Sequence, residues 1–589
     1  MKKKLLYIFT TVTVLGISSC SNYLDEMKPQ GALSVETLAT EKGVQGLLTG
    51  AYAVIDGFIE HPFKYTRSFP WHAAPSNWIY GSVAAGDSHK GSDPGDQSQG
   101  NQIEDFTATP TNEFMRGKWW HTYEGVNRSN KVLQTLAVAV KANTISGDAA
   151  KKIEAEARFL RGHYHFEGKK MWGNGAIYVD EKAIDFNIPN GTDIWAKIET
   201  DFKFGVDNLP TKQAEVGRAT KWAAQAYLAK AKMFQGKYAE AMPLLNEIIA
   251  SGQYALANNY SDNFNAETDN NKESVFEIQY SVNDGASEGQ NGGFAEALAF
   301  PFANSGAPSG CCGFHQPSQN LVNAHKTDAN GLPLFDTFNK TDLKSDIQNG
   351  VYVNSTTAYQ ADNTTPIDAR LDWSVGRRGI PYLDWGLHPG QSWIRDKSGV
   401  YGPYTPIKNA YYKRQEGSLV STFATYWRGS ANNFRLIRYA DVLLWAAECE
   451  VEIGSLDKVQ TYVDLIRARA SNSKVLLPNG TPAANYLVNT YKTAGSNFTA
   501  NGKAYARDAV RFERRLEFAM EGHRFFDLVR WGIADVEINK YLDGERTKSP
   551  LLKSAKFIKG KHEYYPVPQE QIDVSSIGGV PTLKQNAGY

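Results

Sequence analysis

The sequence predicts a mostly α-helical fold that carries long irregular loops, and three observations support this. Apolar residues recur at helical spacing in several segments. Two stretches, at about 58–105 and 282–429, are rich in Gly, Pro, Asn, Asp and Ser and show no helical period. Aromatic residues make up 12% of the 589 residues, and many lie in those stretches, whereas disordered segments contain few. We therefore expect ordered loops on a helical scaffold, an arrangement typical of a binding surface.

The first 19 residues form a predicted secretory leader. Three lysines, Lys2, Lys3 and Lys4, precede an apolar run over 5–17. This run is shorter than the ~20 apolar residues that span a bilayer, so we expect it to be removed. The sequence Ile17-Ser18-Ser19-Cys20 resembles the bacterial lipoprotein box. The resemblance implies cleavage before Cys20 and lipidation of its thiol, and several acyl chains would hold the protein on a membrane.

Charge and length narrow the class of protein. Without the leader lysines the chain has 60 basic and 63 acidic residues, whereas a nucleic-acid binder needs a basic surface. No second run of 18 or more apolar residues follows the leader. We expect one large body with an N-terminal region over 20–270 and a C-terminal region over 271–589. Within the latter, 282–430 is predicted to be loop-rich and 435–535 helical.

The other three cysteines indicate no thiol chemistry. Cys311 and Cys312 are adjacent, and Cys449 lies in an apolar helical segment. A chain of this size can bury a sufficient core without a disulfide framework. We therefore expect Cys449 in the core. We expect thiols at Cys311 and Cys312 in preference to a disulfide between neighbours, which the sequence leaves open.

Helical periodicity is clearest over 218–254. Its first half places one apolar face at Ala224, Tyr227, Leu228, Ala231 and Phe234. Gly236 ends this helix and a second begins near Tyr238, and the pair resembles a tetratricopeptide unit. Similar patterns occur at 43–58, 155–168 and 438–470. Because a regular array would repeat every ~34 residues, we expect helical pairs separated by long insertions.

Catalytic and metal-binding motifs are weak. A G-x-S-x-G match at 285–289 lacks the helix that a nucleophile elbow requires. The sequence Asp-Ser-His at 87–89 is predicted to be a turn, since the members of a triad come from separate segments. His163 and His165 lie on different helix faces, and no zinc spacing or phosphate-binding loop occurs. We expect no metal and no cofactor.

Several long motifs occur in order along the chain. The strongest is ERRLEFAMEGHRFFDLVRWG at 513–532, followed by YYPVPQEQID and a terminal QNAGY. Others are RYADVLLWAAE at 438–448, AEARFLRGHYHF at 155–166 and CSNYLDEMKP at 20–29. Together these motifs closely resemble the SusD/RagB family of Bacteroidetes outer-membrane lipoproteins. The departures are Ala369 and Ala587, where the family usually has proline.

The resemblance implies a SusD-like fold in which tetratricopeptide-like helical pairs support a loop-rich ligand-binding face. It implies a lipoprotein on the cell surface that captures oligosaccharides or polysaccharides and delivers them to a SusC-like TonB-dependent transporter in the outer membrane. It implies no catalytic activity. Asp25 and Glu26 loosely resemble the acidic signal that directs such lipoproteins to the outer face.

The residue pattern of the 513–532 motif predicts a structural role. Its apolar residues share one helical stripe, while acidic and basic residues alternate around it. We expect a buried or half-buried ion-pair network against the scaffold, with His523 as a core residue.

Candidate glycan-binding residues come from the loops. Sugars present apolar C–H faces edged with hydroxyls, so a site needs aromatic platforms beside polar side chains. The segment at 71–82 offers Trp71, Asn77, Trp78 and Tyr80. The segment at 370–396 offers Trp373, Arg377, Tyr382, Asp384, Trp385, Trp393 and Arg395.

The sequence is also compatible with three other functions, namely peptide capture, hydrolysis and a purely structural role. A RagB-like member would capture peptides, and the mixed charge of the loops does not separate peptides from glycans. A surface hydrolase needs only two carboxylates at a set separation in space, which sequence spacing does not reveal. A structural scaffold without a ligand would present a flat loop face.

Overall fold

The computed structural model describes residues 34–58, 68–183, 185–285, 291–303, 306–348, 351–352, 361–421 and 428–589. Cys20, Asp25, Glu26 and residues 286–289 of the G-x-S-x-G match lie outside these ranges. The described chain is mostly helical, as the sequence predicts.

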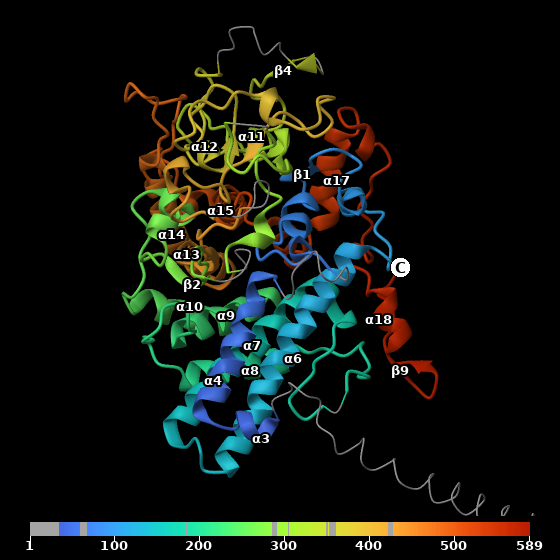
Figure 1. Ribbon diagram of the computed structural model, residues 1–589. Coiled ribbons are helices and arrows are strands. Elements are labelled where there is room, and N and C mark those ends of the chain that lie inside the picture. The colour runs from blue at the N-terminus through green and yellow to red at the C-terminus, as the bar shows by residue number, and fades with distance from the viewer. Residues whose placement is uncertain are drawn as a thin grey trace, which may run out of the picture.

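Helices stacked side by side form the scaffold (Figure 1). Each packs on the next along the chain: α4 (Glu41–Ala53), α6 (Glu113–Lys141), α7 (Gly147–Trp172), α8 (Trp195–Asn208), α9 (Lys221–Phe234) and α10 (Tyr238–Ala250). The short α3 (Val35–Leu38) precedes them. The predicted break at Gly236 is confirmed, because α9 ends at Phe234 and α10 begins at Tyr238.

The stack continues across the long insertion. α13 (Tyr439–Ile453) packs directly on α10, and α14 (Leu456–Asn472) and α15 (Phe498–Glu517) follow. The tetratricopeptide-like pairs that are separated in sequence are therefore neighbours in space.

Local signals explain where these helices begin and how closely they approach. Side-chain oxygens of Thr40, Asn112 and Thr220 cap α4, α6 and α9 by accepting hydrogen bonds from N–H groups two or three residues later. Gly125 of α6 faces Tyr164 of α7, and a Cβ atom at this glycine would lie only 2.3 Å from the tyrosine ring. A side chain here would therefore push the two helices apart.

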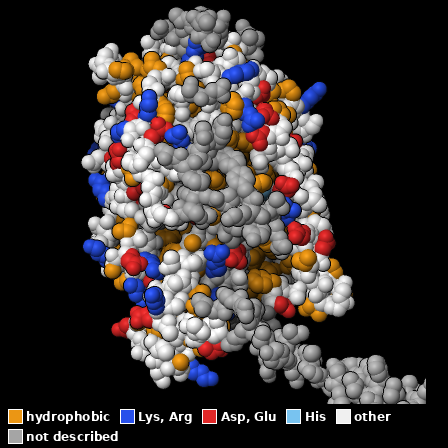
Figure 2. All heavy atoms as spheres, viewed as in Figure 1, with side chains coloured by type: hydrophobic (Ala, Val, Ile, Leu, Met, Phe, Trp, Pro, Cys, Tyr) orange, Lys and Arg blue, Asp and Glu red, His pale blue; other side chains and the backbone are white. Residues whose placement is uncertain are grey.

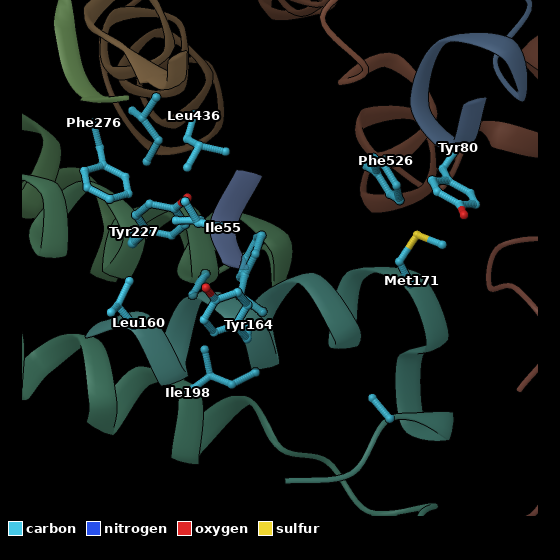
Figure 3. Packing of buried hydrophobic residues seen from close by; sticks show 14 of the residues in the cluster. Ile55, Tyr80, Leu160, Tyr164, Met171, Ile198, Tyr227, Phe276, Leu436 and Phe526 are labelled. Atoms are coloured by element: carbon cyan, nitrogen blue, oxygen red, sulfur yellow. The ribbon is translucent and has the colours of Figure 1, made fainter. Parts of the chain in front are cut away.

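The main hydrophobic core joins the helical stack to the C-terminal region. Tyr227 of α9 packs with its ring centroid 6.2 Å from that of Phe276 (Figure 3). The same cluster includes Leu436 and Phe526, so the predicted 20–270 and 271–589 regions share one core.

The strands form short antiparallel pairs. They are β1 (Ser88–Gly91) with β3 (Phe314–Pro317), β2 (Ser274–Ile278) with β8 (Phe434–Arg438), β4 (Ile347–Gln348) with β5 (Val351–Tyr352), β6 (Val375–Gly376) with β7 (Thr405–Pro406), and β9 (Ser576–Ile577) with β10 (Val580–Pro581). The β2–β8 pair closes the base of the loop-rich insertion. Because the insertion leaves and returns on adjacent strands, α13 can resume the stack immediately after β8.

The helices of the insertion and of the first loop are all short among the residues described there. These include the π-helix η3 (Trp78–Val83), α5 (Asn101–Glu104), α11 (Gln319–Ala324) and α12 (Leu371–Ser374). The predicted absence of long helices there is confirmed for the described part of the chain.

The C-terminal segment returns to the N-terminal helices. After α16 (Arg524–Arg530) and α17 (Ala534–Glu545), the C-terminal arm, defined as α18 (Gln569–Val574) with β9 and β10, lies beside α6 (Figure 1). The N–H of Gln569 donates to Pro110 O at 2.9 Å just before α6. No helix in the described ranges combines the length and apolar character needed to cross a membrane.

The cysteine predictions have different outcomes. Cys449 is a buried thiol of α13, as predicted. The expectation of thiols at Cys311 and Cys312 is wrong, because the structure joins them in a disulfide whose Cα atoms are 3.1 Å apart. The predicted turn at 87–89 is also wrong, since Ser88 and His89 belong to β1 and pair with β3.

Candidate functional site

The 513–532 motif forms the predicted ion-pair network, and its carboxylates are structural. Glu517 receives guanidinium groups from Arg438 at 2.8 Å and from Arg370 at 3.0 Å, and all three side chains are buried. Burial alone would raise the pKa of Glu517, but Arg469 and these two arginines lower it to about 2. A carboxylate held ionised in this way is unsuited to proton transfer at neutral pH.

His523 lies in the same part of the core. Its ring packs against Phe518 with centroids 5.1 Å apart. Burial lowers the pKa of His523 well below its ordinary value, so the imidazole is neutral at neutral pH. The expectation of a core role for this motif is confirmed.

The first predicted aromatic group is packed inside the protein. Trp71 is 3% exposed and Trp78 is 1% exposed. The Trp78 indole N–H donates to Trp71 O at 3.3 Å. The Tyr80 hydroxyl lies 2.8 Å from both His72 O and Phe114 O. These rings belong to the core and offer no face to a ligand in this structure.

Asn77 is buried with them. It adopts a left-handed backbone conformation at φ 47°, immediately before the π-helix. Its side-chain amide donates to Pro75 O at 3.2 Å and to Glu167 Oε2 at 3.3 Å. The polar residues around this segment predict a surface loop, but the segment instead fills space between α6, α7 and the C-terminal region.

Three members of the second group are also buried. Arg377 forms a bidentate ion pair with Asp372, at 2.7 and 2.9 Å, within the loop-rich region. Tyr382 donates its hydroxyl to Pro406 O, and Trp393 packs edge-on against Tyr382 with centroids 5.2 Å apart. These three buried side chains stabilise the loop at 370–396 from its interior side.

Two other members are half-buried and tie loops together. The Trp373 indole N–H donates to Ser473 O at 2.6 Å, next to the end of α14. Arg395 pairs with Asp93 at 2.9 Å and with Asp96, which links 391–398 to the loop after β1. Their polar atoms already have protein partners.

The remaining two members, Asp384 and Trp385, reach the surface. Trp385 is half-buried, its indole N–H donates to Tyr411 O at 2.8 Å, and its ring meets Tyr411 edge-on at 5.9 Å. Asp384 is exposed and accepts hydrogen bonds from the backbone N–H groups of Lys413 and Arg414. These contacts fix the Trp385 ring while leaving part of it open to solvent.

A neighbouring segment completes this surface. Tyr412 is half-buried, and the Arg414 guanidinium lies 4.0 Å from its ring centroid. Arg414 is held in turn by Glu267 at 2.7 Å and by Asp384 at 3.3 Å. The ammonium of Lys413 lies 5.8 Å from the Trp385 ring centroid. We call Asp384, Trp385, Tyr412, Lys413 and Arg414 the Trp385 surface.

Tyr412, Lys413 and Arg414 are missing from the sequence-based candidates. The signal was present as YYKR at 411–414, an aromatic pair beside two basic residues in a segment without periodicity. Tyr411 is buried while Tyr412 is half-exposed. Burial raises the pKa of Tyr412 to about 12, so its hydroxyl remains a hydrogen-bond donor at neutral pH.

The Trp385 surface is suited to binding. It combines parts of two aromatic rings with two basic side chains and a carboxylate on one exposed patch. Such a patch can stack on an apolar C–H face and donate hydrogen bonds to hydroxyl or carbonyl oxygens. Within the described ranges, no group of three or more His, Cys, Asp or Glu side chains is placed to hold a metal ion.

Comparison with known proteins identifies relatives that match about half to three quarters of the chain. A SusD-like protein of Bacteroides ovatus is 27% identical over 295 residues, which cover 48% of this chain and about half, 50%, of that protein. The starch-binding protein SusD of Bacteroides thetaiotaomicron is 23% identical over 454 residues, covering 74% of this chain and 72% of that protein.

A solved structure shares the fold. Surface glycan-binding protein A from Bacteroides thetaiotaomicron, in complex with laminarihexaose, superposes with a TM-score of 0.63 at 21% identity. The superposition covers 93% of this chain and 99% of that one.

Family models cover both parts of the chain. A family described as starch-binding associating with outer membrane matches residues 22–233. The model of the SusD family matches residues 272–589, more than half of the chain, so the chain belongs to the SusD family.

Proposed function

We propose that this protein is a cell-surface, glycan-binding lipoprotein. It captures oligosaccharides or polysaccharides and delivers them to a SusC-like TonB-dependent transporter of the outer membrane. Cys20 carries the lipid that holds it there. The protein acts by binding and has no catalytic role.

The observation that carries this proposal is the Trp385 surface. Seven of the glycan-binding candidates from the sequence are aromatic. Among them, Trp385 has a ring that is fixed by a hydrogen bond, is partly open to solvent and lies beside exposed polar groups. The fixed ring loses little conformational freedom on binding, which favours affinity from a small contact. Tyr412 adds a second ring and a hydroxyl donor within the same patch.

Relatives support the ligand class. The family that matches residues 22–233 is described as starch-binding. One relative is named a starch-binding protein, and one structure with this fold was solved with a glucan hexasaccharide. Starch and laminarin are both neutral glucose polymers, so a neutral glucan is the first ligand to test.

The test is a binding screen of the purified protein with laminarihexaose, maltohexaose and a panel of polysaccharides. We expect at least one glycan to bind, and Trp385→Ala to weaken that binding. Trp195→Ala is the matched control, because Trp195 is also half-buried but lies on α8 of the helical scaffold. The control should bind like the parent.

Three outcomes would contradict the proposal. If Trp385→Ala and the parent bind the glycan with equal affinity, the Trp385 surface is not the glycan-binding site. Binding of peptides in place of every glycan would favour the peptide-capturing alternative. Release of shorter sugars from the panel by the purified protein would show that it is a hydrolase.

A further inference from the structure

A cleft lies on the helical scaffold, between α6 and the C-terminal arm. Its volume is about 560 Å³, within the ~300–1,000 Å³ range of small-molecule sites. Figure 2 shows hydrophobic side chains gathered where the C-terminal arm meets the scaffold. We call this hollow the α6 cleft. The residues that line it include Trp119, Trp120, Tyr123, Asn127, Phe186, Asn187, Gln571 and Val574.

The floor of the cleft is rigid. The Trp119 ring is buried and packs 4.5 Å from the Tyr123 ring and 4.8 Å from the Trp172 ring, between centroids. The Tyr123 hydroxyl accepts a hydrogen bond from Ile177 N at 2.8 Å and donates one to Ile177 O at 3.1 Å. The cleft is therefore already formed without a ligand.

Its walls offer apolar faces. Trp120 is half-buried, Phe186 is 42% exposed and Val574 is 68% exposed. An exposed aromatic ring beside a rigid floor can cover the C–H face of a sugar ring. The side chains come from α6, the loop after α7 and the C-terminal arm, so the cleft is enclosed by three separate segments.

Unused amide groups lie between these faces. The side-chain amides of Asn187 and Gln571 have no hydrogen-bond partner within the described ranges, and both residues are half-buried. The Asn127 amide has one long contact, 3.5 Å, to Glu124 Oε2. Each amide offers both donors and an acceptor, as hydroxyl groups require.

The charges of the residues that line the α6 cleft indicate which polar ligands it can bind. Among the described residues that line the cleft, none is Lys, Arg or His. Their acidic member, Glu124, is paired with Arg128 at 2.7 Å. Because these described residues provide no unpaired charge, they offer no counterpart for a sulfate, a uronate or a charged peptide end. It fits a neutral, hydroxyl-rich molecule.

We infer that the α6 cleft is a second carbohydrate-binding site, which takes a neutral oligosaccharide independently of the Trp385 surface. The inference rests on the proposed function only for the ligand class. Two weak sites on one chain would raise the avidity for a long polysaccharide that can occupy both.

The experiment measures binding of laminarihexaose and maltohexaose to the full-length protein by titration calorimetry. The single-site variants are Trp120→Ala, Trp385→Ala and the amide pair, which is Asn187→Ala together with Gln571→Ala. Two further variants combine Trp385→Ala with Trp120→Ala or with the amide pair. Trp195→Ala again serves as the control, and thermal melts confirm folding. The amide pair guards against a loss of binding through misfolding, because neither side chain forms a hydrogen bond or ion pair within the described ranges that its removal would break.

We expect Trp385→Ala to keep residual binding of one hexasaccharide. Adding Trp120→Ala, or the amide pair, should then lower that residual affinity at least fivefold. If the double variant binds like Trp385→Ala alone, or if neither hexasaccharide binds the parent, the inference is wrong. If Trp120→Ala reduces only the recovery of a co-purifying protein, the cleft is a protein contact and the inference is again wrong.

The experiment distinguishes a failure of the α6 cleft from a failure of the Trp385 surface. If Trp385→Ala binds like the parent while Trp120→Ala loses binding, the α6 cleft stands and the Trp385 surface is rejected. The reverse result rejects the cleft alone.

Discussion

Arg438 and Glu517 form an ion pair of 2.8 Å in which both side chains are completely buried. Arg438 ends β8, where the loop-rich insertion rejoins the scaffold, and Glu517 ends α15. The pair therefore anchors the base of the insertion to the helical stack. Glu517 also contacts Arg370 at 3.0 Å, within the insertion itself.

Removing this carboxylate should destabilise the protein strongly. Glu517→Gln removes one of the carboxylates that the buried Arg370, Arg438 and Arg469 share, and breaking a buried ion pair costs ~3–5 kcal/mol in comparable cases. Urea unfolding should show a lower midpoint. The control is Glu452→Gln, because Glu452 pairs with Arg507 in a partly exposed position, where a pair contributes ~0–1 kcal/mol. Similar losses in both variants would contradict an anchoring role.

Glu296 should give the opposite pH dependence to a paired carboxylate. It is buried and accepts hydrogen bonds from Ser76 N at 3.0 Å and Ser76 Oγ at 2.7 Å. Burial raises the pKa of Glu296 from 4.5 to about 7. Because the folded pKa is the higher one, its contribution to stability is complete below pH 4.5 and is lost as the pH rises through 7.

The test compares the parent with Glu296→Gln, which stays neutral at every pH. The parent should lose roughly 3 kcal/mol relative to the variant between pH 4.5 and pH 7. Urea unfolding at several pH values measures this difference. A constant difference across the range would show that Glu296 does not titrate on unfolding.

Trp78→Ala should impair folding. The ring is 1% exposed and packs edge-on against Phe314 with centroids 6.0 Å apart. Truncation of a buried tryptophan costs ~3–5 kcal/mol through lost burial and the cavity left behind. Thermal melts should show a large fall for Trp78→Ala and a smaller one for Trp385→Ala. A stable Trp78→Ala variant that binds glycan less tightly would restore Trp78 as a ligand contact.

The sequence predicts the scaffold better than the site, and the reason is physical. A helix face repeats every 3.6 residues, so Tyr227 and Leu228 are assigned to the core from spacing alone. The segment at 71–82 has no period, and its Gly, Pro and Ser neighbours look the same whether a loop covers the surface or fills a gap in the core. The burial of Trp78 depends on distant elements such as β3, which its local sequence does not specify.

The α6 cleft depends on the fold in the same way. Trp119 and Trp120 are adjacent on α6, and adjacent residues on a helix point about 100° apart. One of the two therefore has to leave the core-facing stripe. The walls contributed by Phe186 and Gln571 come from segments far apart in sequence, so only the fold brings them to Trp120.

Cys20→Ala should yield a folded protein that is lost from the outer membrane. The substitution removes the thiol that carries the lipid in our proposal. Cys20 lies outside the described residues, and the hydrophobic core that they form begins at Ala39, so every residue of that core is retained. Cell fractionation with an antibody against the protein measures the distribution. The control is Cys449→Ala, which alters a buried thiol and should stay in the membrane fraction. Retention of Cys20→Ala in membranes of cells that lack the transporter would rule out the lipid anchor.

Trp385→Ala should weaken glycan binding by a predictable amount. If the ring covers about 50 Å² of a sugar, ~25 cal/mol per Å² gives roughly 1 kcal/mol, or about a fivefold loss of affinity. Two or three such contacts with a few hydrogen bonds would give a total of about −4 to −6 kcal/mol, which corresponds to millimolar to tens of micromolar binding. Weak binding suits a protein that has to release its ligand to a transporter.

Trp385→Phe keeps a ring but loses the hydrogen bond to Tyr411 O, so it should recover part of the affinity. Titration calorimetry on the glycan that binds best distinguishes the variants. If phenylalanine and alanine weaken binding equally, the fixed orientation of the indole matters more than the area of the ring; if neither weakens it, the Trp385 surface is not the site.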